Sequence, residues 1–87
     1  MTWEELLKCN VNDKFLLLNV YDYFFFFGRS GVDFKTRIVE INSKNSHIKE
    51  MLFTSKNFHG HQWLRDVDVS KVHLIPLTPK LKAIYGV

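Results

Sequence analysis

The chain has 87 residues and a mass of 10.3 kDa, which leaves room for one domain and excludes a second hydrophobic core. Its hydrophobic fraction of 46% and charged fraction of 24% are typical of a folded globular protein and exclude a disordered chain. The net charge of +3 is unevenly placed: residues 44–87 carry seven basic against three acidic side chains, and residues 1–43 carry five against six.

Residues 3–9 are predicted to form a short helix. Thr2 precedes it and Glu5 follows three positions later, which matches the capping box, in which each side chain accepts a hydrogen bond from the other residue's backbone amide. Apolar side chains recur on one side of this helix at positions i, i+3 and i+4, namely Trp3, Leu6 and Leu7.

From residue 14 onward the composition favours short β-strands, because β-branched and aromatic residues are frequent. Strands are predicted over residues 15–20, 23–27, 34–41, 46–53, 63–65 and 71–75.

The connections between these strands are predicted from glycine, asparagine and polar clusters. Turns are expected at residues 28–31 and 42–45, a polar loop at 54–62, and a tight turn or single 3₁₀ turn at 66–70. Pro76 and Pro79 are expected to end the sheet, because proline lacks the backbone donor that a strand ladder needs.

A meander of short strands, with a tight turn before the last one, resembles an SH3-like barrel over residues 14–77. We therefore expect a mainly β fold: a small SH3-like barrel of five or six short antiparallel strands with a short N-terminal helix. An OB-like barrel is the alternative, although it requires a helix between the third and fourth strands. The chain is expected to be a single domain, with residues 1–13 as helix and connection, 14–77 as barrel and 78–87 as tail.

Catalytic and metal-binding patterns are weak in this sequence. His59 and His61 flank Gly60, but structural zinc usually needs four Cys or His ligands, and Cys9 is the only cysteine. No phosphate-binding glycine loop, nucleophile elbow or metalloprotease helix motif occurs. We expect no enzyme activity, no catalytic residues, no metal and no cofactor.

A surplus of apolar side chains is the strongest functional signal. If residues 23–27 form a strand, Phe24 and Phe26 lie on one face, and Phe25 and Phe27 lie on the other. A small barrel has one interior, so one pair of rings is expected outside it, where a contiguous apolar patch would mark an interaction site. Trp63, in contrast, is predicted to lie in the core.

The leading hypothesis is a non-enzymatic small binding protein that acts through a protein–protein interface, with self-association as one form of it. The small size and the many Phe, Lys and Asn residues favour an inhibitor or accessory factor from a virus or mobile element. The alternative is single-stranded nucleic-acid binding by a basic, aromatic-bearing barrel face. The candidate partner-binding residues are Phe24, Phe26, Lys56, Phe58, His59, His61 and Arg65.

Cysteine content and hydropathy predict the compartment. A lone Cys9 suits a reducing environment. The first residues carry neither the basic n-region nor the long apolar segment of a signal peptide, so none is expected. The longest apolar run is far shorter than the ~20 residues that span a bilayer. We therefore expect a cytoplasmic protein with no membrane partner.

Overall fold

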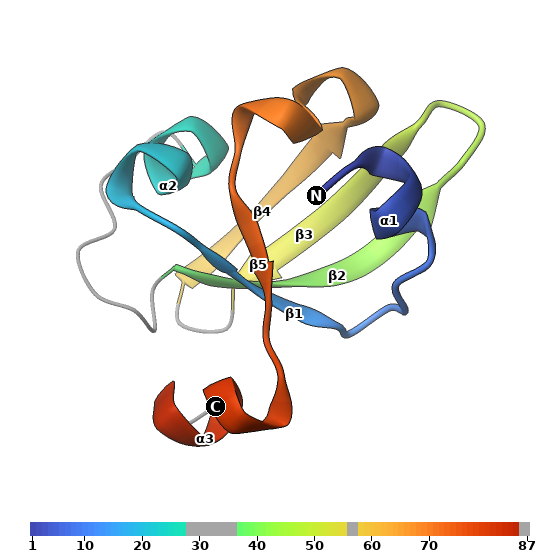
Figure 1. Cartoon of the computed structure of the whole chain (residues 1–87). Helices are drawn as coiled ribbons and strands as arrows, with labels where there is room; N and C mark the ends of the chain where they lie inside the picture. The colour runs from blue at the N-terminus through green and yellow to red at the C-terminus, as the bar shows by residue number, and fades with distance from the viewer. Residues whose placement is uncertain (28–36, 56–57, 86–87) are drawn as a thin grey trace.

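A computed structural model describes residues 1–27, 37–55 and 58–85 (Figure 1). In chain order, these residues form the following elements: helix α1 (Trp3–Leu7), strand β1 (Lys14–Leu17), helix α2 (Val20–Phe27), strands β2 (Ile38–Asn45), β3 (Glu50–Ser55) and β4 (Phe58–Arg65), 3₁₀ helix η1 (Asp66–Lys71), strand β5 (Leu74–Pro76) and helix α3 (Pro79–Tyr85).

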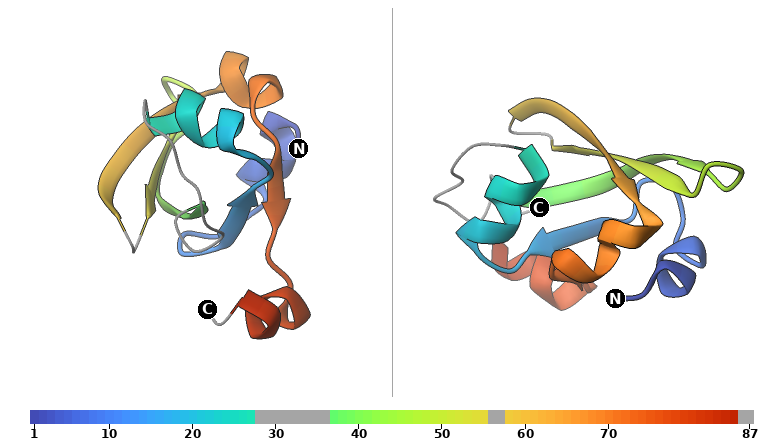
Figure 2. Two further views of the ribbon diagram at one scale, coloured as in Figure 1. Left: turned by 90° about the vertical axis from the view of Figure 1, so that its left-hand side faces the viewer. Right: turned by 90° about the horizontal axis from the view of Figure 1, so that it is seen from above.

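The five strands form one antiparallel sheet in the order β4-β3-β2-β1-β5. The sheet is curved, with α1, α2 and η1 on one side of it and α3 on the other (Figures 1 and 2). The prediction of a mainly β fold with a short N-terminal helix is confirmed. The sheet does not close into a barrel, because β4 and β5 are its two edges and do not pair with each other. The helix that an OB-like barrel needs has no room, since two positions separate β3 from β4.

The main core lies on the concave side of the sheet. Strand β3 shows the period of two that places alternate side chains inward, with Met51 and Phe53 buried and Leu52 partly exposed. The rings of Phe53 and Phe15 meet edge to face, with centroids 6.2 Å apart. The buried members of this cluster are Leu6, Phe15, Leu17, Tyr23, Val39, Ile41, Met51, Phe53, Leu64, Val69, Val72 and Leu74.

A smaller cluster on the other side of β1 holds α3 against the sheet. Leu16, Ile38 and Leu77 are buried there, and Leu81 of α3 packs against them. The periodic apolar residues of the tail therefore belong to a helix, which Thr78 caps by accepting a hydrogen bond from the Leu81 amide at 3.2 Å.

The capping box of α1 is confirmed. The Glu5 amide donates to Thr2 Oγ1 at 3.2 Å, and the Thr2 amide donates to Glu5 Oε1 at 3.0 Å. The hydrogen bond from the Thr2 backbone lowers the pKa of the Glu5 carboxyl. The helix ends at Leu7, earlier than predicted, where Lys44 Nζ donates to the carbonyl oxygens of Leu7, at 3.1 Å, and of Cys9.

The predicted strand over residues 23–27 is wrong, because these residues belong to helix α2. Asn19 begins the helix: its Oδ1 accepts the Asp22 amide at 3.0 Å, and its carbonyl accepts the Tyr23 amide at 3.3 Å. Aromatic residues favour strands only when a pleated surface is available to pack against, and here packing favours a helix that buries Tyr23. The predicted alternation of the four Phe side chains is therefore also wrong.

Several boundaries in the second half also differ from prediction. The predicted turn at 42–45 lies inside β2, and the chain turns instead at 46–49, where Lys49 has a φ of 53°. Much of the predicted loop at 54–62 belongs to β3 and β4. Polar side chains can occupy one face of an exposed edge strand, so polarity alone did not identify a loop there. The 3₁₀ turn is confirmed as η1, and the predicted turn at 28–31 lies outside the described residues.

Candidate functional site

The outward side of α2 carries three exposed aromatic rings. Tyr21, Phe24 and Phe25 are 81%, 58% and 47% exposed, and they fall at i, i+3 and i+4. At about 100° per residue, these positions share an arc of roughly 100° on one side of the helix. The opposite side carries the buried Asp22 and Tyr23. We call Tyr21, Phe24 and Phe25 the aromatic face.

Hydrogen bonds fix the N-terminal end of α2 to two other segments. The Leu18 amide donates to the His73 carbonyl at 3.1 Å, and Arg37 Nη1 donates to the Leu18 carbonyl at 2.9 Å. Two residues into the helix, Asp22 Oδ1 lies 3.1 Å from His73 Nδ1. These contacts tie α2 to the segments before β2 and before β5, so the aromatic face is held in a defined orientation.

The predicted partner-binding residues do not form one site. Phe24 is exposed on the aromatic face, whereas His61 and Arg65 are exposed on β4. Phe26 lies in α2, and Phe58 and His59 lie in β4, but their side chains are not among those that the structure describes. Lys56 lies outside the described residues. Tyr21 was not among the predicted partner-binding residues, because it falls between the strands predicted over residues 15–20 and 23–27.

A second exposed surface lies on the outer face of β4. His61, Trp63 and Arg65 alternate along the strand and share this face, whereas Leu64 between them is buried. Trp63 is 41% exposed, so its predicted place in the core is wrong. Successive side chains of a strand point to opposite faces, so burial of Leu64 places both of its neighbours, Trp63 included, on the outer face.

Acidic residues interrupt the positive charge of this outer face. In the register of the sheet, Arg65 lies opposite Glu50, and Trp63 lies opposite Leu52. His61 lies opposite Thr54, which in turn lies opposite Glu40 of β2. The outer face therefore has an apolar centre with both signs of charge around it.

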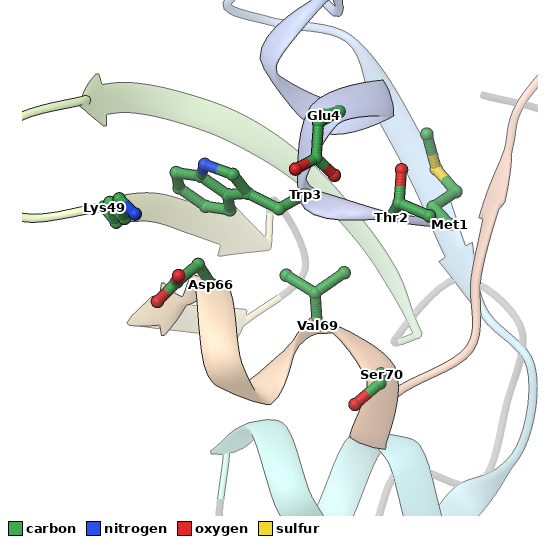
Figure 3. A pocket seen from close by; sticks show the side chains of 8 residues that line it. All are labelled: Met1, Thr2, Trp3, Glu4, Lys49, Asp66, Val69 and Ser70. Atoms are coloured by element: carbon green, nitrogen blue, oxygen red, sulfur yellow. The ribbon is translucent and has the colours of Figure 1, made fainter.

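A cavity of about 350 Å³ opens between α1, η1 and the β2–β3 turn (Figure 3). The Trp3 ring extends from α1 toward Lys49, and Val69 of η1 supplies a second apolar surface. Its lining combines apolar side chains with both signs of charge: Met1, Thr2, Trp3, Glu4, Lys49, Asp66, Val69 and Ser70. This mixed lining does not select one class of ligand.

Cys9 lies close to α1 and is partly buried. Burial raises the pKa of its thiol, so the nucleophilic thiolate is disfavoured at neutral pH. Across residues 1–27, 37–55 and 58–85, no three His, Cys, Asp or Glu side chains cluster in a way that could hold a metal ion. No helix in these ranges has the length and apolar character needed to span a membrane.

No protein-family model matches the chain, and no curated protein or solved structure matches it either.

Proposed function

We propose that this protein acts by binding another protein through the aromatic face of α2. The observation that supports the proposal is the exposure of Tyr21, Phe24 and Phe25 side by side on one helix. Single apolar side chains on a surface are common, but adjacent rings form a patch of the kind that marks interaction sites. Burying one Phe side chain contributes about 1.5–3 kcal/mol, so covering this patch would provide substantial binding free energy.

The shape of the aromatic face favours a partner with a groove. Anchors at i, i+3 and i+4 on a helix are typical of helix-in-groove recognition. The hydrogen bonds at Leu18, Asn19 and Asp22 fix the helix before binding, which lowers the entropy lost when the partner docks. In this function the chain carries out no catalytic step, and we predict that it acts as an inhibitor or accessory factor of its partner.

Single-stranded nucleic-acid binding is a second candidate, on the outer face of β4. Exposed Trp63 between His61 and Arg65 is the arrangement that favours it, because bases stack on aromatic rings beside cationic side chains. Glu50 and Glu40 on the same face weaken this candidate, since they repel phosphates. Protein binding is therefore the better supported function.

We also propose that the fold is a variant of the SH3-like barrel that is open between β4 and β5. The meander β2-β3-β4 and the 3₁₀ turn η1 before the last strand support this relationship.

Replacing Phe24 by serine is expected to weaken partner binding by roughly thirtyfold or more, which corresponds to a hot spot of about 2 kcal/mol. The matched control is Ile48→Ser, because Ile48 is also 58% exposed but lies in the β2–β3 turn. Tagged wild type and both variants are used to recover partners from a lysate, with and without nuclease. Affinity for the recovered partner is then measured, and light scattering shows whether this partner is a second copy.

Equal affinities of the two variants for the partner would contradict the proposal. Loss of all recovered material after nuclease treatment would instead favour the nucleic-acid candidate. Both variants should keep the denaturation midpoint of the wild type, because substitutions at exposed sites usually change stability by no more than about 0.5 kcal/mol.

A further inference from the structure

Strand β4 forms one edge of the sheet, and the two edges differ in how they are protected (Figure 1). At the other edge, β5 has three residues and ends with Pro76, which has no backbone amide hydrogen to donate. Strand β4 has eight residues and contains neither the proline nor the lysine that commonly protects an edge. It is therefore the edge at which a further strand can be added.

The register of the sheet shows which backbone groups of β4 point away from β3. The Asp66 amide donates to the Lys49 carbonyl at 3.0 Å, so these two residues form a hydrogen-bonded pair. The next pair in the register is Arg65 opposite Glu50. Hydrogen-bonded and non-hydrogen-bonded pairs alternate along an antiparallel ladder. Every second residue of β4, counting back from Arg65, therefore directs its backbone N–H and C=O groups toward the open edge.

The residues with these open backbone groups are His61, Trp63 and Arg65, which also carry the exposed side chains of the outer face. Gln62 points to the opposite face from Trp63 and is exposed as well, so both faces of the strand are open at this point. Backbone and side-chain groups of the same three residues are thus available to one extended peptide.

We propose that the edge of β4 binds an extended segment of a partner protein by adding it to the sheet as a further antiparallel strand. In this mode of recognition, backbone hydrogen bonds supply affinity and alternate side chains supply specificity. Residues directly opposite each other on neighbouring strands point to the same face of the sheet. The segment therefore places three side chains, at positions i, i+2 and i+4, beside His61, Trp63 and Arg65.

The side chains of β4 determine the chemistry of this segment. An acidic side chain beside Arg65 pairs with a guanidinium, which is always charged in proteins, and an apolar side chain beside Trp63 packs on the indole ring. The His61 imidazole has a ring N–H in either protonation state and can donate it to a second acidic side chain. The expected motif is acidic-x-apolar-x-acidic.

The acidic residues of the outer face do not reverse this preference. Neighbouring strands lie about 4.8 Å apart, so the added strand is about 10 Å from Glu50 on β3 and farther from Glu40 on β2. That distance is about the Debye length at 0.1 M salt, and Arg65 lies between the segment and Glu50. A nucleic acid that lies across the outer face, in contrast, approaches both carboxylates.

A second copy of this chain fits the edge less well. Strand β4 has no Asp or Glu between Phe58 and Arg65, so pairing two copies of the strand gives Arg65 no acidic partner. A segment of another protein is therefore the favoured occupant. This inference adds a second binding surface to the aromatic face of α2 and does not rest on it.

Titration with a synthetic peptide to millimolar concentration, followed by NMR, tests the proposal. The peptide has seven residues and blocked ends, with glutamate, leucine and glutamate at the second, fourth and sixth positions and threonine elsewhere. We expect the largest shifts at the amides of His61, Trp63 and Arg65, because these amides gain hydrogen bonds. N-methylation of the peptide at the second, fourth and sixth positions should weaken binding at least about tenfold, since it removes donors to β4. N-methylation at the third and fifth positions, whose amides point away from β4, should not.

Arg65→Gln should raise the dissociation constant of the peptide about threefold, which is typical of an opposite-charge pair on neighbouring strands. Lys80→Gln is the matched control, because it removes one positive charge from an exposed position in α3 and should leave the dissociation constant unchanged. Phe24→Ser should also leave it unchanged, so the test is independent of the aromatic face.

The proposal is overturned if the peptide shifts none of the β4 amides, or if N-methylation at the two sets of positions has the same effect. It is also overturned if light scattering shows a dimer that Trp63→Thr converts to a monomer, since a second copy would then occupy the edge. Binding of oligothymidylate but not of the peptide would overturn it in favour of the nucleic-acid candidate. None of these results affects the Phe24→Ser experiment on partner recovery.

Discussion

Replacing Phe53 by alanine is expected to destabilise the protein by about 3–5 kcal/mol, which is the usual range for removing a buried aromatic ring. Phe53 is fully buried near the middle of β3, and its ring meets that of Phe15 at an interplanar angle of 70°. A domain of this size has a total stability of roughly 4–13 kcal/mol, so the substitution removes a large part of it. Urea denaturation followed by circular dichroism measures the loss.

Phe24→Ala is the matched control, because it removes the same ring from an exposed position. It should change the free energy of unfolding by no more than about 0.5 kcal/mol. Comparable losses for Phe53→Ala and Phe24→Ala would contradict the division of the phenylalanines into a core set and a surface set.

Replacing Arg37 by methionine is expected to cost about 1.5–3 kcal/mol, the value of a hydrogen bond to a charged group. The Arg37 side chain is buried, and its guanidinium donates to the Leu18 carbonyl just before α2 begins. Methionine retains much of the apolar stem but leaves this carbonyl without its donor. Removing a buried charge offsets part of the loss, because the guanidinium no longer has to be desolvated.

Arg65→Met controls for the loss of one positive charge, since Arg65 is exposed on β4. Arg37→Met should unfold at a lower urea concentration than Arg65→Met. Hydrogen exchange should show that, relative to the wild type, Arg37→Met increases exchange most at the amides of α2. If both variants unfold at the same urea concentration, the contact with Leu18 does not stabilise the attachment of α2.

The elements governed by local chemistry could be predicted from the sequence. Thr2 and Glu5 define the start of α1 through side chains three positions apart, and the 3₁₀ turn η1 follows from the polar residues around Asp66 and Asp68. The β-rich character of the middle of the chain was also predicted, because β-branched and aromatic residues recur in β2 and β3.

The structure of residues 20–27 could not be predicted from composition. A run of aromatic residues contains neither a clear period of two nor a clear period of 3.6, so apolar content alone does not distinguish a strand from a helix. Asn19 is the local signal that favours a helix, since asparagine is a preferred N-cap. Packing of Tyr23 in the core then determines which side of the helix faces inward.

The helix at residues 20–27, predicted in part as a strand, also explains why the candidate site was predicted only in part. The surplus of apolar side chains predicted that one pair of the four Phe rings would be exposed, without specifying which pair, and the structure places Phe24 on the surface. Its neighbours on that surface depend on the helix, because helical spacing groups Phe24 with Tyr21 and Phe25, whereas strand spacing would group it with Phe26. Trp63 was misplaced for a related reason, since the direction of a side chain in β4 depends on a register that one strand alone does not specify.

Comparing the solvent exposure of Tyr21 and Tyr23 tests the aromatic face of α2 most directly. The two tyrosines are two positions apart, so a strand would place both rings on one face, whereas a helix places them about 200° apart. A soluble paramagnetic agent is added, and the relaxation of the assigned ring protons is measured by NMR. Strong relaxation of Tyr21 with little effect on Tyr23 is the predicted result, because the first ring is 81% exposed and the second is buried. Similar relaxation of the two rings would show that α2 does not present the aromatic face.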